Sequence, residues 1–255
     1  MKKDLIVFDL DGTLAKSKAP MDKEMTGLLK QLLAVKKVAV IGGGKYEIFQ
    51  MQLLEPLQDA GKLLSNLFLF PATSTSFYKY DQGWEKVYSH ELPKEDRVLI
   101  KQTFEAVFKE IGYQHPSQVY GEIIEDRITQ VTFSVFGQDI VKVLGDEGIR
   151  QKDEWKEKNT PLKIKIAELV QARLPHLEVR AAGHTSIDVT KKGIDKAFGL
   201  SQIEKYLQIK IPEMLFIGDA IFPGGNDYAV VGTGVDYLAV KDPEETKGII
   251  RNILK

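Results

Sequence analysis

Short apolar runs occur near both ends of the chain, and segments with apolar residues at helical spacing lie between them. Leu5–Phe8, Val38–Ile41 and Met214–Ile217 are unbroken apolar segments. Segments of this kind indicate strands that are buried on both faces of a parallel sheet. Apolar residues recur at helical spacing after the first run, and alternation of strands with helices predicts an α/β fold.

The middle of the chain predicts hairpins and helices instead. Asp81-Gln82-Gly83 separates two strand-like segments, as in a β-hairpin. Gln130–Phe136 alternates polar and apolar residues, which indicates a sheet with one face in water. We therefore expect an α/β core in two pieces, interrupted by an α+β insert. The expected boundaries are 1–90 and 187–255 for the core and 91–186 for the insert.

Composition excludes several classes of protein. The 255 residues are 43% hydrophobic and 28% charged, an ordinary globular balance, and the formal net charge is −1. This charge predicts no general attraction to nucleic acid or to an anionic membrane. The absence of cysteine rules out disulfides, thiolate metal sites and cysteine nucleophiles. The apolar run that precedes Asp9 is too short for a secretory signal, so we expect a soluble, cytoplasmic protein.

The strongest local motif is Asp9-Leu10-Asp11-Gly12-Thr13, directly after the first predicted strand. Ligands of open parallel sheets bind beyond the carboxyl ends of the strands, which is where Asp9 falls. Two carboxylates two residues apart suit a nucleophile beside a general acid and base. The alternative is a strand-end turn with solvated aspartates, which we consider less favoured.

Three further motifs fall at comparable places. Gly218-Asp219 ends another predicted strand, and Asn226 and Asp227 follow after a glycine turn. These hard oxygen ligands suit Mg²⁺. Lys196 begins a predicted helix and could reach the strand-end carboxylates, although a lone lysine there is more often exposed. Gly42-Gly43-Gly44 precedes a helix, where free N–H groups bind phosphate, but a plain turn is nearly as well favoured.

Together these motifs resemble the haloacid-dehalogenase superfamily of phosphotransferases, with a Rossmann-like parallel-sheet core. The insert resembles the α+β cap of the type IIB branch. Gly193-Ile194-Asp195-Lys196 and Phe222-Pro223-Gly224-Gly225-Asn226-Asp227 are similar to the eukaryotic-type phosphomannomutases. That resemblance implies Asp9 as the nucleophile that becomes an aspartyl phosphate, and Asp11 as the general acid and base. It also implies Lys196 in catalysis and a sugar phosphate as substrate.

The same resemblance implies the remaining site residues. Mg²⁺ would be held by the Asp9 carboxylate, the Asp11 backbone carbonyl and the Asp219 carboxylate, supported by Asp227 or Asn226. The residues expected to contact substrate or phosphate are Thr13, Lys18, Gly43, Gly44, Arg127, Gln138, Ser186 and Asp188. Assembly as a homodimer through the cap is an arrangement that the family allows.

Some positions depart from the phosphomannomutase pattern. Gly44 stands where the family has serine, Lys18 where it has arginine, and Gln138 where another arginine is expected. A mutase must hold a bisphosphate in two orientations, and losing a bidentate guanidinium weakens a second anion site. These departures favour a sugar-phosphate phosphatase, with a phosphohexomutase as the alternative. A non-catalytic sugar-phosphate-binding regulator is a third hypothesis, but binding alone does not require the full set of carboxylates.

Overall fold

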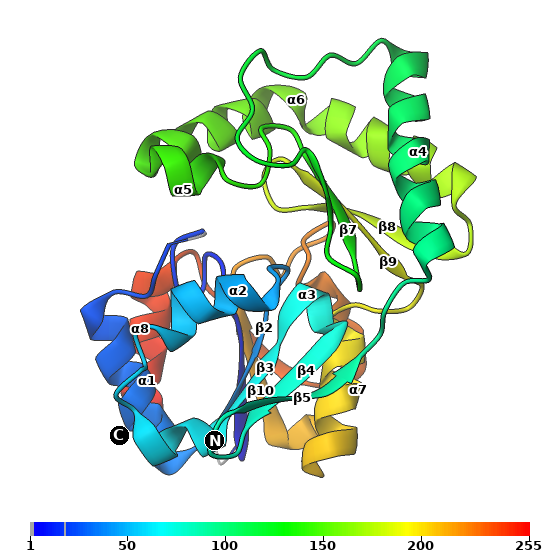
Figure 1. Cartoon of the computed structure of the whole chain (residues 1–255). Helices are drawn as coiled ribbons and strands as arrows, with labels where there is room; N and C mark the ends of the chain where they lie inside the picture. Colours follow the sequence, from blue (N-terminus) through cyan, green and yellow to red (C-terminus); the bar gives the residue numbers. More distant parts are fainter. Residues whose placement is uncertain (1–2, 18) are drawn as a thin grey trace. The chain divides into compact units, whose positions relative to one another are not determined.

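The computed structural model describes residues 3–17 and 19–255, which divide into two compact units (Figure 1). The core unit comprises Met1–Ser89 and Ile194–Lys255, and the inserted unit is His90–Gly193. The expected return to the core at residue 187 is therefore wrong by seven residues, since the core resumes at residue 194. The reason is that strand β9 (Ser186–Lys191) pairs on both sides with strands of the inserted unit.

The core unit is built on one seven-stranded sheet with the order β11-β10-β1-β2-β3-β4-β5. The five strands from β11 to β3 are parallel, and β4 and β5 add an antiparallel hairpin at one edge. The strand bounds are Leu5–Asp9 (β1), Lys37–Ile41 (β2), Leu67–Phe70 (β3), Ser76–Tyr80 (β4), Trp84–Ser89 (β5), Met214–Gly218 (β10) and Asp236–Ala239 (β11). The predicted α/β core is confirmed.

Strand register brings the two ends of the chain together at one edge of this sheet. Phe8 pairs with Ile217 on one side of β1, and Asp9 pairs with Ile41 on the other. Since all three strands are parallel, the segments that follow Asp9, Ile41 and Gly218 emerge at the same edge. Every residue of β1 is buried, which explains why its sequence is uniformly apolar up to Asp9.

Helices cover both faces of the core sheet. On one face, α1 and α8 pack with the segment around Phe49 and Leu53, and on the other α7 packs against β1 and β10. The helix bounds are Lys23–Val35 (α1), Tyr46–Phe49 (α2), Pro71–Ser74 (α3), Lys196–Leu207 (α7) and Pro243–Ile253 (α8). A π-helical turn, Gln50–Leu54, follows α2, and 3₁₀ turns span Gly61–Asn66, Ile211–Glu213 and Tyr228–Thr233.

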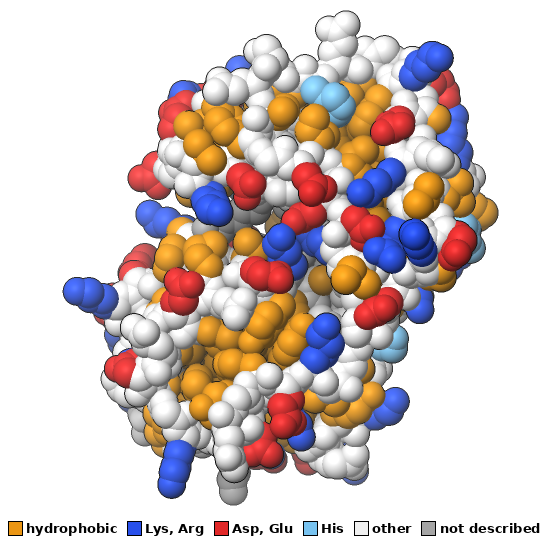
Figure 2. Space-filling model, in the orientation of Figure 1, with side chains coloured by type: hydrophobic (Ala, Val, Ile, Leu, Met, Phe, Trp, Pro, Cys, Tyr) orange, Lys and Arg blue, Asp and Glu red, His pale blue; other side chains and the backbone are white. Residues whose placement is uncertain are grey.

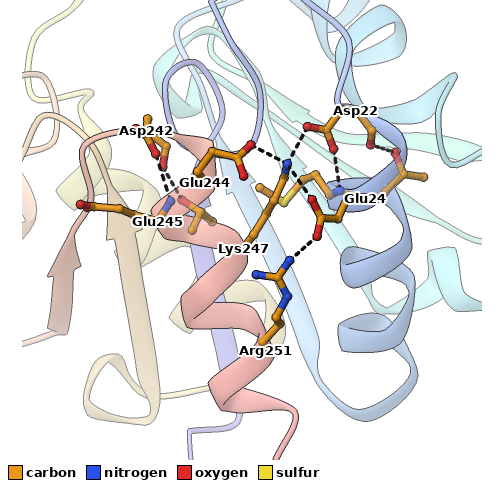
Figure 3. Close-up of polar contacts among 10 residues, drawn as sticks. Asp22, Glu24, Asp242, Glu244, Glu245, Lys247 and Arg251 are labelled. Atoms are coloured by element: carbon orange, nitrogen blue, oxygen red, sulfur yellow. Dashed lines mark hydrogen bonds and ion pairs between the residues drawn. The ribbon is translucent and has the colours of Figure 1, made fainter.

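A charged network joins α1 to α8 (Figure 3). Lys247 of α8 is buried, and its Nζ lies 2.7 Å from Asp22, 2.6 Å from Glu244 and 3.2 Å from Glu24. Asp22 also caps α1, because its side chain accepts a hydrogen bond from the Met25 N–H at 2.8 Å. The first and last helices of the chain are thus connected through one lysine.

The inserted unit has a four-stranded antiparallel sheet with the order β6-β7-β9-β8 and helices on one face. Its bounds are Lys94–Ile111 (α4), Ile124–Asp126 (β6), Val131–Ser134 (β7), Ile140–Leu144 (α5), Asp146–Arg173 (α6), Leu177–Ala182 (β8) and Ser186–Lys191 (β9). Val131, Phe133, Ile187 and Val189 face the apolar core beneath α4 and α6. The alternate residues form the opposite, polar face. The alternation in Gln130–Phe136 predicts this division, but the expected exposure to water is wrong for β7, because Thr132 and Ser134 are buried.

The surface carries both signs of charge. Figure 2 shows Lys and Arg interspersed with Asp and Glu on the visible face, consistent with the net charge of −1. It also shows an apolar area on the core unit. Among the residues that the structure describes, no helix combines the length and apolar character needed to cross a bilayer.

Candidate active site

Asp9 and Lys196 meet at the carboxyl edge of the core sheet. Asp9 ends β1 and is 3% exposed, while Lys196 begins α7 and is completely buried. The side chain of Asp195 caps α7 by accepting from the Phe198 N–H at 2.8 Å, which fixes where the helix begins. The Lys196 ammonium donates to the carboxylates of both Asp9 and Asp227. Lys196 is therefore part of the site and not the exposed helix lysine that the alternative supposed.

Asp227 holds Lys196 from the opposite side. Its Oδ1 accepts from Lys196, and its Oδ2 accepts from the Ala220 N–H at 3.0 Å. The carboxylate is completely buried and lies at the end of the loop that follows β10. Since both oxygens have protein donors, Asp227 is placed to orient the lysine.

Asp219 approaches the loop after β1 closely. Gly12 has a φ of +87°, and a Cβ atom there would lie 2.6 Å from the Asp219 Oδ2 atom. Glycine meets both requirements, since it tolerates a positive φ and leaves room for the carboxylate. The close approach explains why a glycine follows the acidic pair Asp9 and Asp11.

Burial and mutual repulsion perturb the acidic groups. Burial raises the pKa of Asp9 well above its ordinary value despite the opposing effect of Lys196, and the Asp227 carboxylate adds to the rise. Burial, followed by the Asp227 charge, also raises the pKa of Asp219 to about 6. Burial alone would lower the pKa of Lys196, but Asp227 and Asp9 outweigh it and raise that pKa. The site therefore has excess negative charge and a firmly protonated lysine.

The donor set fits a divalent cation. One carboxylate oxygen from each of Asp9, Asp219 and Asp227 lies within 4.8 Å of the others. These three carboxylates and the Lys196 ammonium leave two negative charges uncompensated, which a divalent cation would neutralise. Carboxylate oxygens are ligands that Mg²⁺ prefers. Because Asp227 is engaged with Lys196 and Ala220, Asp9 and Asp219 are the side chains best placed for direct ligation.

Asp11 and Thr13 lie on the loop that follows β1. Asp11 Oδ1 accepts a hydrogen bond from the side chain of Gln52 at 3.0 Å. Thr13 is completely buried, and its Oγ1 has no hydrogen-bond partner among the described residues. Sequence reasoning missed Gln52, although a glutamine between Phe49 and Leu53 on an inward-facing helical stripe could have indicated a buried polar contact.

The glycine loop after β2 is supported by a left-handed turn. Ala72 and Thr73, which follow β3, have φ values of 48° and 57°. Their N–H groups donate to the carbonyls of Gly44 and Gly42, each at 2.8 Å. A Cβ atom at Gly44 would lie 2.9 Å from the Ile48 Cγ2 atom, so the serine expected from the family could not enter without displacing Ile48.

The other predicted contact residues lie in the inserted unit or outside this cluster. Ser186 and Asp188 lie on the polar face of the inserted sheet, where Asp188 accepts from the Thr132 hydroxyl at 2.8 Å. Arg127 donates to Glu125 at 2.6 Å and to the Gln138 side-chain oxygen at 2.9 Å. Asn226 is exposed on the loop after β10, and the predicted phosphate contact Lys18 lies outside the described residues.

A strand-end aspartate on a parallel sheet, a buried lysine and an inserted α+β unit are the features of one family. A family model described as haloacid dehalogenase-like hydrolase matches residues 6–230, and the chain belongs to this family. Within it, the chain is phosphomannomutase-like. It is 25% identical over 266 residues to the phosphomannomutase of Encephalitozoon cuniculi, covering 100% of this chain and 94% of that protein. It is 24% identical over 247 residues to the phosphomannomutase of Spinacia oleracea, covering 95% and 92%.

Solved structures share the fold. The IMP-nucleotidase of Plasmodium falciparum, bound to IMP, aligns with a TM-score of 0.68 at 19% identity, covering 99% of this chain and 68% of that one. A haloacid dehalogenase-like hydrolase from Bacteroides thetaiotaomicron aligns with a TM-score of 0.64 at 17% identity, covering 99% and 100%. Both likenesses support an α/β core with an inserted cap, as the sequence predicted.

Proposed function

We propose that the protein is a Mg²⁺-dependent phosphatase of small phosphorylated metabolites, with sugar phosphates as its substrate class. The observation that supports this most directly is the meeting of Asp9, Lys196, Asp219 and Asp227 at one sheet edge. These residues come from both ends of the chain. Binding alone does not require a buried carboxylate that is held beside a fixed ammonium.

In the first step, the Asp9 carboxylate attacks phosphorus in line with the ester oxygen. A carboxylate–phosphorus bond forms while the ester P–O bond breaks. Asp11 gives its proton to the departing oxygen, so the alcohol leaves in neutral form. Lys196, fixed by Asp9 and Asp227, provides positive charge beside the transferring group. Thr13 and the backbone of Gly43 and Gly44 contact the phosphoryl oxygens.

In the second step, water attacks the phosphorus of the aspartyl phosphate. Asp11, now ionised, takes a proton from that water, and the bond between phosphorus and the Asp9 oxygen breaks. Inorganic phosphate leaves, and both aspartates return to their starting states. Asp9 and Asp219, with the Asp11 carbonyl that the resemblance implies, would hold Mg²⁺, which would supply positive charge that offsets the charge of the phosphoryl oxygens.

Charge in the inserted unit favours hydrolysis over mutase chemistry. A mutase needs a second site that attracts a phosphate dianion. The family resemblance implies that Arg127 is a phosphate-binding arginine. Its charge is offset by Glu125 at 2.6 Å, and Gln138 provides no charge beside it. In this proposal the inserted unit acts as a cap that selects the leaving group and excludes bulk water.

Replacing Asp9 tests the proposal. Asp9→Asn should abolish Mg²⁺-dependent hydrolysis of p-nitrophenyl phosphate, because an amide cannot form the acyl phosphate. Asp59→Asn, which changes an exposed carboxylate of the core unit, should retain wild-type activity. Circular dichroism should show that both variants fold. Hydrolysis at the wild-type rate by a folded Asp9→Asn protein would refute the nucleophile assignment.

The phosphomannomutase relatives make mutase activity the second candidate. One incubation separates the two activities. The protein is mixed with mannose 1-phosphate or glucose 1-phosphate, Mg²⁺ and a hexose bisphosphate. Release of inorganic phosphate supports the phosphatase, whereas conversion into the 6-phosphate identifies a mutase.

A further inference from the structure

Gln52 is a completely buried polar residue that connects three parts of the loop after β1. Its side-chain Nε2 lies 3.0 Å from Asp11 Oδ1, 3.0 Å from the Ala19 carbonyl and 3.3 Å from the Lys16 carbonyl. Its own backbone carbonyl accepts from the Met21 N–H at 2.9 Å. One residue therefore holds both the Asp11 carboxylate and the chain that follows it.

The three oxygens decide which way the Gln52 amide points. An amide nitrogen carries two donor hydrogens, while the amide oxygen can only accept. A flipped amide would place Oε1 against three acceptors and would lose every contact. Oε1 instead lies buried, with no hydrogen-bond partner among the described residues. Leaving a buried acceptor without a hydrogen bond costs free energy. The hydrogen bonds of Nε2, including the one to Asp11, offset this cost.

The backbone at Gln52 is also unusual. Gln52 lies in the π-helical turn Gln50–Leu54, between Phe49 and Leu53, which are both completely buried. The wider turn of a π-helix is rare and occurs frequently at functional sites. The buried neighbours restrict the side chain, so the amide is held rigidly toward Asp11.

We propose that Gln52 is the positioning residue that orients the Asp11 carboxylate for proton transfer to the leaving group. This inference rests on the proposed function, in which Asp11 is the general acid and base. In this role Gln52 acts without contacting substrate. It fixes one oxygen of the Asp11 carboxylate and the loop backbone at Lys16 and Ala19. Without this hydrogen bond to Asp11, the carboxylate would spend less time in the geometry that delivers a proton.

Leaving-group chemistry distinguishes this role from a purely structural one. Gln52→Met removes the hydrogen bonds at similar length, and Gln50→Met makes the same change at an exposed position of the same turn. The probes are p-nitrophenyl phosphate, whose phenolate departs without help, and benzyl phosphate, whose alkoxide needs a proton. The quantity to be measured is kcat/KM. It reports the steps up to and including departure of the leaving group, and it does not depend on hydrolysis of the aspartyl phosphate.

We expect Gln52→Met to lower kcat/KM for benzyl phosphate by ~10-fold to ~100-fold, the range that misplacement of a reacting group costs. The loss for p-nitrophenyl phosphate should be much smaller, and Gln50→Met should leave both values unchanged. Equal losses on both substrates, or no loss on either, would overturn the proposal. If Gln52→Met does not fold, Gln52→Asn replaces it in the experiment. Its amide is one methylene too short to reach Asp11, so the same selective loss on benzyl phosphate is expected and the same results would overturn the proposal.

Repeating the comparison of the two substrates in an Asp11→Asn background tests the positioning role of Gln52 separately from the general-acid role of Asp11. If Gln52 acts through Asp11, adding Gln52→Met to Asp11→Asn should cause no further selective loss on benzyl phosphate. A selective loss that persists there would overturn the positioning role while leaving the proposed function intact. If Asp11→Asn alone fails to slow benzyl phosphate more than p-nitrophenyl phosphate, the general-acid assignment itself is wrong.

Discussion

Gly12 is the residue at which backbone conformation and the acidic site depend on each other most directly. Gly12→Ala would add a Cβ atom at a φ of +87° and only 2.6 Å from the Asp219 Oδ2 atom. We expect a loss of about 1–2 kcal/mol in the free energy of unfolding from the backbone alone. Displacement of Asp219 should also weaken Mg²⁺ binding.

Thermal unfolding with and without Mg²⁺ measures both effects of this substitution. Gly12→Ala should lower Tm and reduce the increase in Tm that Mg²⁺ produces in the wild type. Gly232→Ala is the matched control, because a Cβ atom there meets nothing within 4 Å. An unchanged response of Gly12→Ala to Mg²⁺ would contradict the placement of Asp219 beside the cation.

The residues of the site differ in how far the sequence could reveal them. Asp9 and Asp219 follow buried apolar strands, and Lys196 follows the capping residue Asp195, so local patterns predict their places. The helical spacing of Gln52 with buried neighbours could indicate its burial, but no local pattern identifies its partners, because Asp11, Lys16 and Ala19 belong to a distant loop. Contacts between segments far apart in sequence decide its role, and periodicity does not report them.

At the scale of elements, the connection between α1 and α8 depends on Lys247. Lys247→Met would leave Asp22, Glu24 and Glu244 close together without their shared cation. Because these carboxylates are more than half exposed, water screens much of the repulsion, and we expect a loss of about 1 kcal/mol in stability.

Urea unfolding at low and high salt checks this estimate. The difference between wild type and Lys247→Met should shrink in high salt, because salt screens charges near the surface. Lys241→Met, which removes an exposed ion pair between the residue before the helix cap and Glu245 of α8, should have almost no effect. A salt-independent loss for Lys247→Met would point to packing of its aliphatic chain in place of charge.

Element boundaries were harder to predict than element types. The strands of the core sheet and the helix that begins at Lys196 lie close to the predicted segments. The helix predicted after Gly44 forms as the short helix α2, which a π-helical turn then follows. The predicted domain boundary at residue 187 assigned most of β9 to the core unit. The sequence does not reveal that β9 pairs with β7 and β8 of the inserted unit.

At the scale of the molecule, the acidic site couples pH and Mg²⁺ to overall stability. Asp219 has a pKa of about 6, above the 3.8 of an ordinary aspartate. Without a cation, the folded protein binds more protons than the unfolded chain between these values. The stabilisation that protonated Asp219 contributes is fully present below pH 3.8, and it is lost as pH rises through 6.

Mg²⁺ should reverse this loss, because it replaces the proton. The increase in Tm on adding Mg²⁺ should therefore be large at pH 7.5 and small at pH 5, where protons compete for the carboxylates. A cation at 100 times its dissociation constant stabilises by about 2.7 kcal/mol. Equal increases in Tm at both pH values would contradict the proposed ligands. Asp219→Asn should remove most of the response.

The order of strands in the core sheet has a consequence for synthesis on the ribosome. Strand β1 is made well before its neighbour β10, which begins only at Met214. The nascent chain must therefore carry an apolar strand with one unpaired edge until β10 has been made, a state that favours aggregation. The inserted sheet, whose strands all lie between Ile124 and Lys191, can close earlier, so co-translational folding should begin in the middle of the chain.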